Sequence, residues 1–455
     1  MSIIIPANSA VSGGFDVANS CMFNSPDSAS MQKTAGTPTD NNKWTFSAWV
    51  KRSKLGTLQE IFYGEANSTN YCTIRFNDTS DTLTFKNRPG STTSTLTTTQ
   101  VFRDPNAWYH LVVVLDTSNG TAADRDIIYI NGVRETNFST ETHSGSGDVC
   151  FINSNGNPIK ISKGNSASFF DGYMAEAYFI DGQALAASDF GEFDEDSGIW
   201  KPIDASGLTF GNNGFYLDFQ DSANLGNDAN GGTDLTESNL AATDQGIDTC
   251  TNNFAVNNKL SNITSRWTMT NGNNTIQHAN SGAWTAMISS IAPSVGKYYM
   301  ETKITGGASR TMFGVMSADT NIMGYETNLT TICLYYNLSG GEFQESGSTT
   351  SGNNYGTFAD NDTAGIAVDC ANNKIAIYKN GSALVTNHTI PATVTGPIGF
   401  GFTSDSNSTV YQCNYGSPYY TISSGNADAN GYGNFEYAVP SGYFALCTKN
   451  LAEYG

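Results

Sequence analysis

The feature that most constrains the fold is the spacing of apolar residues along the 455-residue chain. Short apolar or alternating runs recur, for example at residues 44–50, 108–115 and 126–130, and clusters of Gly, Asn, Asp and Ser separate them. A period of two is typical of strands that bury one face, whereas the 3.6-residue period of amphipathic helices is almost absent. The sequence therefore predicts an all-β protein.

Two Asn-Gly pairs, at residues 131–132 and 380–381, directly follow strand-like runs. Asn and Gly both accept the positive φ that a two-residue hairpin turn requires, so we expect a hairpin at each position. The 25 Phe, 22 Tyr and 6 Trp supply apolar area that offsets chain entropy, which argues against disorder. A chain of this length is expected to form two or three domains.

The charge balance restricts the partners of the chain. Its formal net charge is −20 and its sequence pI is about 4.4. Phosphate backbones and anionic membranes repel such a protein, so nucleic acid is not expected as a partner. The sequence contains no apolar run long enough to span a bilayer, which predicts no membrane insertion. The N-terminus has no basic segment and only a short apolar run at residues 3–5, so we expect no signal peptide and synthesis in a cytoplasm.

Residues with catalytic or metal-binding chemistry are scattered. The 8 cysteines form no C-x-x-C pair and several lie in strand-like runs, which favours small buried thiols over a zinc site or a disulfide framework. The 4 histidines lack the H-E-x-x-H spacing of zinc proteases. The sequence also has no nucleophile elbow and no phosphate-binding loop, so we predict that the protein is not an enzyme.

Four motifs in the first half of the chain occur in an order that is similar to the laminin-G-like, concanavalin A-type jelly roll. They are W-T-F-S-A-W-V at 44–50, W-Y-H-L-V-V-V-L-D at 108–116, Y-I-N-G at 129–132 and F-D-G-Y-M-A-E-A-Y at 170–178. The resemblance covers residues 20–190 and implies an antiparallel β-sandwich. Residues 1–20 precede it as an N-terminal arm. Residues 191–258 are rich in Gly, Asn and Asp, and we interpret them as a linker or an irregular extension packed against one module.

A second series of motifs resembles the SPRY domain, a β-sandwich that recognises proteins and peptides. The series contains G-K-Y-Y-M-E at 296–301, F-G-V-M at 313–316, T-A-G-I-A-V-D at 363–369, P-I-G-F-G-F at 397–402 and Y-Q-C-N-Y-G at 411–416. The resemblance covers residues 259–418. The remaining residues, 419–455, are rich in aromatic side chains, so we expect an ordered C-terminal segment.

One acidic cluster is a candidate catalytic site. Glu192, Asp194 and Asp196 resemble the E-x-D-x-E strand of concanavalin A-like glucanases, in which alternate carboxylates share one cleft. The third acid here is Asp196, whose side chain is one methylene shorter than the Glu of the pattern. Glu195 would also have to face the core. The cluster also follows the apparent last strand. A solvated turn is therefore favoured, because a glycoside hydrolase would need Glu192 and Asp194 about 5–9 Å apart in a cleft.

Calcium is the one ion that the first resemblance suggests. Laminin-G-like domains often hold calcium at the rim of the sandwich through oxygen ligands, which implies Asp116, Asp124 and Asp126 as candidates here. The alternative is that these aspartates form turns, as Asp commonly does. No other cofactor is expected.

Three aromatic residues are candidates for ligand binding. Tyr325, Phe343 and Tyr355 lie in polar, Gly-rich surroundings that suggest loops. An exposed aromatic ring there could stack on a sugar or anchor a protein contact. Alternatively, each ring folds back to cover the core.

The whole chain resembles predicted structural proteins of bacteriophages, notably marine ones. The resemblance rests on the order of the two modules, on I-I-I-P at residues 3–6 and on P-S-G-Y-F-A-L-C-T-K-N-L at 440–451. It implies a non-enzymatic virion component, such as an appendage, a tail fibre or a capsid decoration, that acts in assembly or host recognition. Its partners would be other virion proteins, copies of itself (a trimer for a fibre), and a host-surface glycan or protein. The alternatives are a glycan-binding adhesin of a virion or bacterial surface and, third, a glycoside hydrolase.

Overall fold

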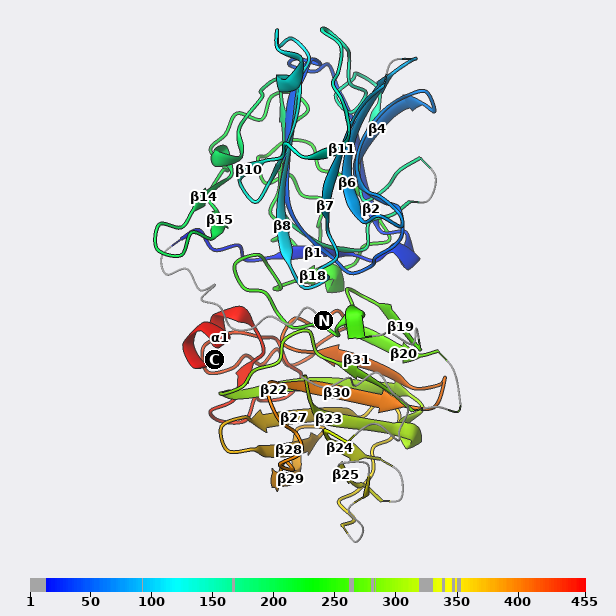
Figure 1. The fold of residues 1–455 in the computed structure, drawn as a ribbon, viewed down its shortest axis with the longest axis vertical. Helices are drawn as coiled ribbons and strands as arrows, with labels where there is room; N and C mark the ends of the chain where they lie inside the picture. The colour runs from blue at the N-terminus through cyan, green and yellow to red at the C-terminus, as the bar shows by residue number, and fades with distance from the viewer. Residues whose placement is uncertain are drawn as a thin grey trace. The chain divides into compact units, whose positions relative to one another are not determined.

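The computed structural model describes residues 14–91, 93–165, 168–261, 266–279, 282, 284–318, 330–337, 340–345, 348–349 and 353–455. The chain divides into a first unit, Val11–Thr251, and a second unit that contains Asn252–Gly455 (Figure 1). In the described residues, each unit has two large sheets, whose strands are antiparallel except for one short parallel pair in the second unit. The prediction of an all-β protein with sandwich domains is confirmed.

The first unit contains two eight-stranded sheets and one two-stranded sheet. The first sheet has the order β10 (Val133–Arg134), β9 (Asp126–Ile130), β8 (Trp108–Asp116), β3 (Lys43–Arg52), β13 (Gly172–Asp181), β1 (Ser20–Phe23) and β18 (Gln245–Gly246), with β16 (Phe215–Leu217) also paired to β13. The second sheet has the order β11 (Phe138–Thr142), β7 (Ser94–Val101), β6 (Thr82–Pro89), β5 (Asn70–Phe76), β4 (Gln59–Asn67), β12 (Pro158–Ile161), β2 (Ser30–Thr34) and β17 (Thr236–Ser238). The small sheet pairs β14 (Gly191–Phe193) with β15 (Trp200–Pro202).

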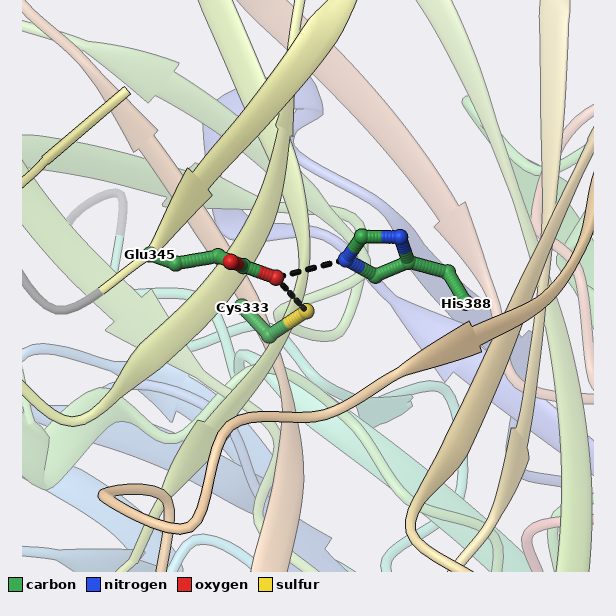
Figure 2. Close-up of side chains that lie close together, drawn as sticks. All are labelled: Cys333, Glu345 and His388. Carbon is green, nitrogen blue, oxygen red and sulfur yellow. Dashed lines mark hydrogen bonds and ion pairs between the residues drawn. The ribbon is translucent and has the colours of Figure 1, made fainter. Parts of the chain in front are cut away.

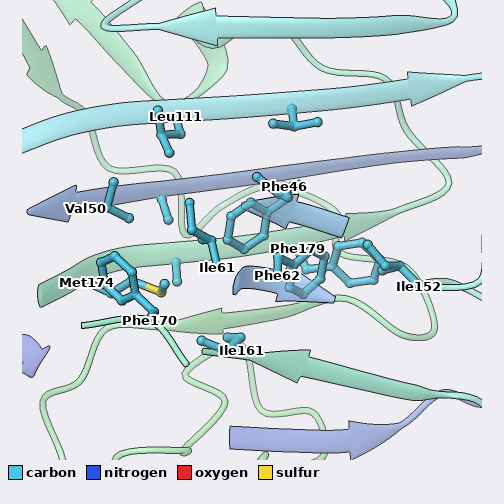
Figure 3. Packing of buried hydrophobic residues seen from close by; sticks show 14 of the residues in the cluster. Phe46, Val50, Ile61, Phe62, Leu111, Ile152, Ile161, Phe170, Met174 and Phe179 are labelled. Carbon is cyan, nitrogen blue, oxygen red and sulfur yellow. The ribbon is translucent and has the colours of Figure 1, made fainter. Parts of the chain in front are cut away.

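The core of the first unit follows from the alternation in its strands. Along β3, every second side chain from Trp44 to Val50 is fully buried in one apolar cluster. Phe46 of β3 stacks on Phe62 of β4 with ring centroids 4.3 Å apart, and Phe179 of β13 packs beside Phe62 (Figure 3). Burying such rings between two sheets contributes about 2–3 kcal/mol for each side chain.

Residues 191–251 belong to the first unit, so the segment is an extension packed against that module and not a free linker. β16 pairs with β13, β17 with β2 and β18 with β1, so the segment adds strands to both sheets. Phe215 and Leu235 enter the core. Lys51 of β3 and Asp248 form a fully buried ion pair of 2.7 Å. The unit therefore ends at Thr251, because these contacts join the extension to the sheets.

The second unit has an eight-stranded and a six-stranded sheet. The larger has the order β19 (Trp267–Thr270), β20 (Thr275–His278), β31 (Val410–Asn414), β22 (Lys297–Gly306), β27 (Thr363–Asp369), β28 (Lys374–Lys379) and β29 (Ser382–Thr389), with β32 (Phe444–Ala445) parallel to β22. The smaller has the order β21 (Thr285–Ile288), β30 (Ile398–Ser404), β23 (Thr311–Ser317), β24 (Ile332–Tyr336), β25 (Glu342–Glu345) and β26 (Ser348–Thr349). Side chains such as Met300, Phe313 and Ile366 fill the core.

The C-terminal segment is built into the second unit. β32 adds to β22, and helix α1 (Thr448–Tyr454) buries Leu451 in the core. Upstream of β32, the buried carboxylate of Glu301 on β22 accepts the backbone N–H groups of Glu436 and Tyr437, both at 2.8 Å. The segment is thus held by hydrogen bonds and by apolar burial.

Both expected hairpins form. Asn131 and Gly132 have φ values of 47° and 81° and connect β9 to β10. Asn380 and Gly381 have φ values of 47° and 78° and connect β28 to β29. Only residues that tolerate positive φ form such turns readily.

The cysteines are free thiols, and seven of the eight are buried while Cys250 is partly exposed. The prediction of small buried thiols is confirmed for those seven. Among the described residues, no helix has the length and apolar character needed to cross a bilayer.

Candidate functional site

One face of the second sheet of the first unit points away from the core. Along β5, Cys72 and Ile74 lie in the core, so Tyr71 and Thr73 lie on the opposite face. Residues directly opposite each other on paired strands share a face. The strand register therefore assembles two outward rows, which are Lys86–Thr73–Tyr63–Lys160 and Arg88–Tyr71–Glu65.

Two cations of β6 lie beside Tyr71, which stacks on Tyr63 at the centre of these rows. The rings of Tyr71 and Tyr63 stack with centroids 6.0 Å apart and an interplanar angle of 25°. Lys86 Nζ lies 5.6 Å from the Tyr71 centroid, and the Arg88 guanidinium lies 5.9 Å from it. Tyr71 is half-buried, whereas Tyr63 is only 3% exposed. We call Tyr63, Tyr71, Lys86 and Arg88 the Tyr71 cluster.

The Tyr71 cluster carries positive charge in a strongly acidic chain. Lys160 is neutralised by Glu65, 2.9 Å away, which also accepts the hydroxyl of Tyr63. In the described part of the chain, no carboxylate forms an ion pair with Lys86 or Arg88. Lys86 and Arg88 can therefore bind an anion without first breaking an ion pair.

A buried carboxyl on the same face is only partly ionised near neutral pH. Glu60 of β4 accepts the hydroxyl of Thr73, and its carboxylate lies 3.8 Å from Arg75. Burial raises the pKa of Glu60 to about 7, although Thr73 and Arg75 act in the opposite direction. A substantial fraction of Glu60 is therefore protonated at neutral pH.

A second candidate site lies where the two sheets of the second unit meet at one edge. Cys333 of β24 and Glu345 of β25 are paired in register, with Cys333 in the core. His388 lies on β29, the edge strand of the other sheet, and pairs with Ile375. Between Val385 and His388 the register slips by one residue, and Asn387 has a φ of 58°. This bulge turns both Val385 and His388 inward, as an extra residue in a strand does.

The side chains of Cys333, Glu345 and His388 converge on one carboxylate oxygen (Figure 2). His388 Nε2 lies 2.5 Å from Glu345 Oε1, and the Cys333 thiol donates to the same oxygen at 3.8 Å. The ring of Phe343 stacks on the imidazole with centroids 3.7 Å apart and an angle of 4°, which fixes the plane of His388. Burial, together with the nearby Glu345, raises the pKa of the Cys333 thiol well above its usual value.

A groove of about 670 Å³ opens beside this group of side chains. Its lining includes Tyr355, Leu384 and Thr386 together with Glu345 and His388. The sequence offered no signal for the convergence, because the three residues that meet come from three strands and are separated by 12 and 43 positions. The site depends on strand pairing and on the bulge in β29.

The three aromatic candidates have different surroundings. Tyr325 lies outside the described residues. Phe343 is fully buried in the core, as in the alternative in which it covers the core. Tyr355 is partly exposed, lines the groove and contacts Phe343 edge-on, with centroids 6.0 Å apart. The structure thus brings Phe343 and Tyr355 together beside His388.

The three calcium candidates do not converge on one point. Among the described residues, the group of Cys333, Glu345 and His388 is the only one with the spacing of a metal-binding cluster. Asp116 accepts both the N–H and the hydroxyl of Ser118, and Asp124 pairs with Arg134 at 2.8 Å. Asp126 is buried, and Ser144 donates its N–H and hydroxyl to it. Each carboxylate therefore serves a local turn or strand contact.

The acidic cluster at residues 192–196 lies at the end of β14 and in the turn that leads to β15. Glu192 on β14 and Asp194 both pair with Lys201 of β15, at 3.3 and 3.2 Å. The pKa of Asp194 is lowered to about 2, first by hydrogen bonds from Ser197 and then by the hydrogen bond and positive charge of Lys201. A general acid must hold a proton near neutral pH, so Asp194, which is ionised there, is not suited to that one role.

Comparison with known proteins identifies the first unit. Residues 26–189 match the Laminin_G_3 family model, described as the concanavalin A-like lectin/glucanases superfamily. The first unit carries a concanavalin A-like jelly-roll domain. This superfamily includes both binding proteins and enzymes, as its description states. No curated protein matches the chain.

Similar solved structures come from diverse organisms. The SPRY domain of human HERC1 has 16% identity and a TM-score of 0.26, with 31% of this chain and 87% of that chain covered. A putative carbohydrate-binding protein from Bacteroides ovatus has 15% identity and a TM-score of 0.32, with 50% and 61% covered. Domains LG4-5 of the mouse laminin alpha1 chain have 8% identity and a TM-score of 0.31, with 98% and 89% covered. These similarities concern the β-sandwich fold alone.

Proposed function

We propose that this protein recognises acidic carbohydrate through the Tyr71 cluster of its concanavalin A-like unit, and that it does so as a component of a virion surface. The observation that carries the binding proposal is the position of Lys86 and Arg88. Both lie over an aromatic ring on an outward sheet face and, among the described residues, have no carboxylate partner. The family match of residues 26–189 supports a carbohydrate as the class of ligand.

The chemistry of the Tyr71 cluster suits a sugar that bears carboxylate or sulfate groups. A tyrosine ring offers an apolar face against which the C–H groups of a sugar ring can pack. Arg88 can form paired hydrogen bonds to a carboxylate or sulfate, and Lys86 adds a point charge. A neutral sugar would use the ring alone, so the charged groups confer preference for acidic saccharides.

Binding without hydrolysis is part of this proposal. Lys201 pairs with Glu192 and Asp194, Ser197 also donates to Asp194, and the pKa of Asp194 is about 2. Retaining and inverting glycosidases need one carboxyl that is protonated and one that is ionised. Asp194 does not supply the protonated carboxyl, and incubation of the protein with an acidic polysaccharide is expected to leave its chain length unchanged.

The test of the binding proposal uses the full-length protein and three polymers: polygalacturonate, dextran sulfate and neutral dextran. We expect binding to the two acidic polymers that weakens as salt is added, because exposed charge pairs are screened. Replacing both Lys86 and Arg88 by alanine should weaken that binding at least about tenfold. Tyr71→Ala should weaken it less.

The matched control replaces Lys43 and Arg134 by alanine. These residues lie on the other sheet of the same unit, in β3 and β10. Both double variants remove one lysine and one arginine, so they change the net charge by the same amount. We expect the control to bind acidic polymers as the unchanged protein does. Equal losses in both double variants, or equal binding to neutral dextran, would refute recognition by the Tyr71 cluster.

The virion location rests on the resemblance of the whole chain to phage structural proteins and on the motif at its end. In this proposal the partners are other virion proteins and further copies of the chain, with a trimer if it forms a fibre. Mass spectrometry of purified particles, followed by cryo-electron microscopy, tests this location. Absence from intact particles would refute the virion role and leave the binding proposal standing, since a bacterial-surface adhesin would use the same face.

A further inference from the structure

The geometry points to a transition-metal site, of the class that binds Zn²⁺, formed by Cys333, Glu345 and His388 at the sheet edge of the second unit. It is independent of the carbohydrate proposal, which concerns the other unit. The three side chains come from β24, β25 and β29, so a bound ion would join the six-stranded sheet to the eight-stranded sheet.

The spacing of the ligand atoms fits a small tetrahedral ion. One atom from each side chain lies within 4.8 Å of the other two. Tetrahedral Zn²⁺ places its sulfur, nitrogen and oxygen ligands roughly 3.3–3.6 Å from one another, given its usual bond lengths. His388 Nε2 and Glu345 Oε1 are 2.5 Å apart, and Cys333 Sγ and the same oxygen are 3.8 Å apart. Side-chain movements on the order of 1 Å would therefore create the ligand set.

The chemistry of the donors selects the class of metal. Thiolate, imidazole and carboxylate together suit Zn²⁺ and neighbouring transition metals, whereas Ca²⁺ and Mg²⁺ prefer oxygen ligands only. Three protein ligands leave a fourth position for water or an incoming ligand. Glu345 and His388 both line the groove, which gives an ion and a fourth ligand a route to the site.

Neighbouring residues hold the ligands in place. The Phe343 ring lies parallel to the imidazole of His388 and limits its rotation. The bulge at Asn387 turns His388 inward instead of toward solvent. Cys333 is fully buried in a central strand of its sheet, so its position is determined by the core. Such supporting contacts raise metal affinity because they reduce the ordering cost of binding.

The decisive experiment measures metal binding by the full-length protein. The protein is treated with a chelator, kept reduced, dialysed against Zn²⁺ alone, and analysed for bound metal and for thermal unfolding. We expect one zinc ion per chain and a higher unfolding temperature for the second unit, because a ligand that binds only the folded state stabilises it. With Co²⁺ as the probe, a thiolate-to-metal absorption band should appear, and this readout needs no variant.

Cys333→Ser and His388→Gln should each lower zinc affinity at least about tenfold. They should also abolish the zinc-dependent rise in unfolding temperature. The controls are Cys370→Ser, a buried thiol of the same unit outside the site, and His143→Gln in the first unit. We expect both controls to bind zinc normally. Failure of the unchanged protein to retain zinc, absence of the cobalt band, or normal binding by both site variants would overturn the proposal.

Discussion

Both units attach an additional segment to the sandwich by strand pairing and by a buried carboxylate, and they differ in the groups that this carboxylate binds. In the first unit, residues 191–251 add three strands to the two sheets and are also held through side chains: Asp248 pairs with Lys51, and Tyr216 donates its hydroxyl to the buried Glu176. In the second unit, the C-terminal segment adds β32 to β22 and buries Leu451, and its backbone N–H groups at Glu436 and Tyr437 donate to the side chain of Glu301.

The difference has an energetic consequence. A side-chain contact leaves a buried charge or hydroxyl behind when one partner is removed, but a second substitution can remove that group too. A backbone N–H cannot be removed by substitution of its side chain, except by proline. The Lys51–Asp248 pair of the first unit should therefore tolerate replacement of both partners, whereas no second side-chain replacement can remove the N–H groups that Glu301 binds in the second unit.

The largest expected effect is on the buried ion pair of the first unit. Asp248→Ala leaves the buried ammonium of Lys51 without this carboxylate and should destabilise the first unit by about 3–5 kcal/mol. Adding Lys51→Met should recover most of that loss. Denaturant unfolding with hydrogen exchange of β3 and β18 provides the measurement. A double variant as unstable as Asp248→Ala would contradict the side-chain account.

The corresponding change in the second unit is Glu301→Ala. It leaves two partly buried N–H groups without their acceptor and should cost about 2–4 kcal/mol. Hydrogen exchange should accelerate at residues 436–437 and in the neighbouring C-terminal segment, with little change in the first unit. Glu301→Gln keeps one acceptor oxygen and should lose less. Uniform acceleration over both units would argue against a local attachment.

The pH dependence of the second unit should report the same carboxyl group. Burial raises the pKa of Glu301 to about 7, above the value near 4.5 of an exposed glutamate. The folded state then holds this proton more tightly than the unfolded state. The contribution of Glu301 to stability is full below pH 4.5 and is lost as pH rises through about 7, by about 1–3 kcal/mol. In Glu301→Gln, unfolding of the second unit should be less dependent on pH over this window, and an unchanged slope would assign the effect elsewhere.

The smallest expected effect on stability is at the Tyr71 cluster. Replacing Lys86 and Arg88 by alanine should change the free energy of unfolding by less than about 1 kcal/mol, because both are half-buried surface residues without an ion-pair partner among the described residues. Thermal unfolding of the double variant provides the measurement. A large loss of stability would mean that the two cations support the sheet, and reduced carbohydrate binding could not then be assigned to recognition.

Much of the fold was predictable from local patterns. The alternation from Trp44 to Val50 predicted a half-buried strand; its apolar face lies in the core, but the opposite face, with Thr45, Ser47 and Trp49, is buried as well. The Asn-Gly pairs predicted both hairpins because the turn requires positive φ at those residues. Residues 191–251 carried a weaker signal, because their short strands are stabilised by pairing with β13, β2 and β1 and not by their own periodicity.

The candidate sites were less predictable. Tyr355 was identified from its polar, Gly-rich surroundings, and it lines the groove. The partners beside it, Glu345 and His388, gave no local signal, since a bulge in β29 orients His388. The Tyr71 cluster was also missed, because Lys86 and Arg88 meet Tyr71 only through the pairing of β5 with β6.

The sequence by itself determined the all-β class, the strands with clear alternation and the two Asn-Gly hairpins, because these depend on residues that are neighbours in the chain. Only the tertiary structure decided the register that collects cations around Tyr71 and the convergence of Cys333, Glu345 and His388. Strand register and bulges arise from contacts between distant segments, and a shift of one residue would move each side chain to the other face of its sheet.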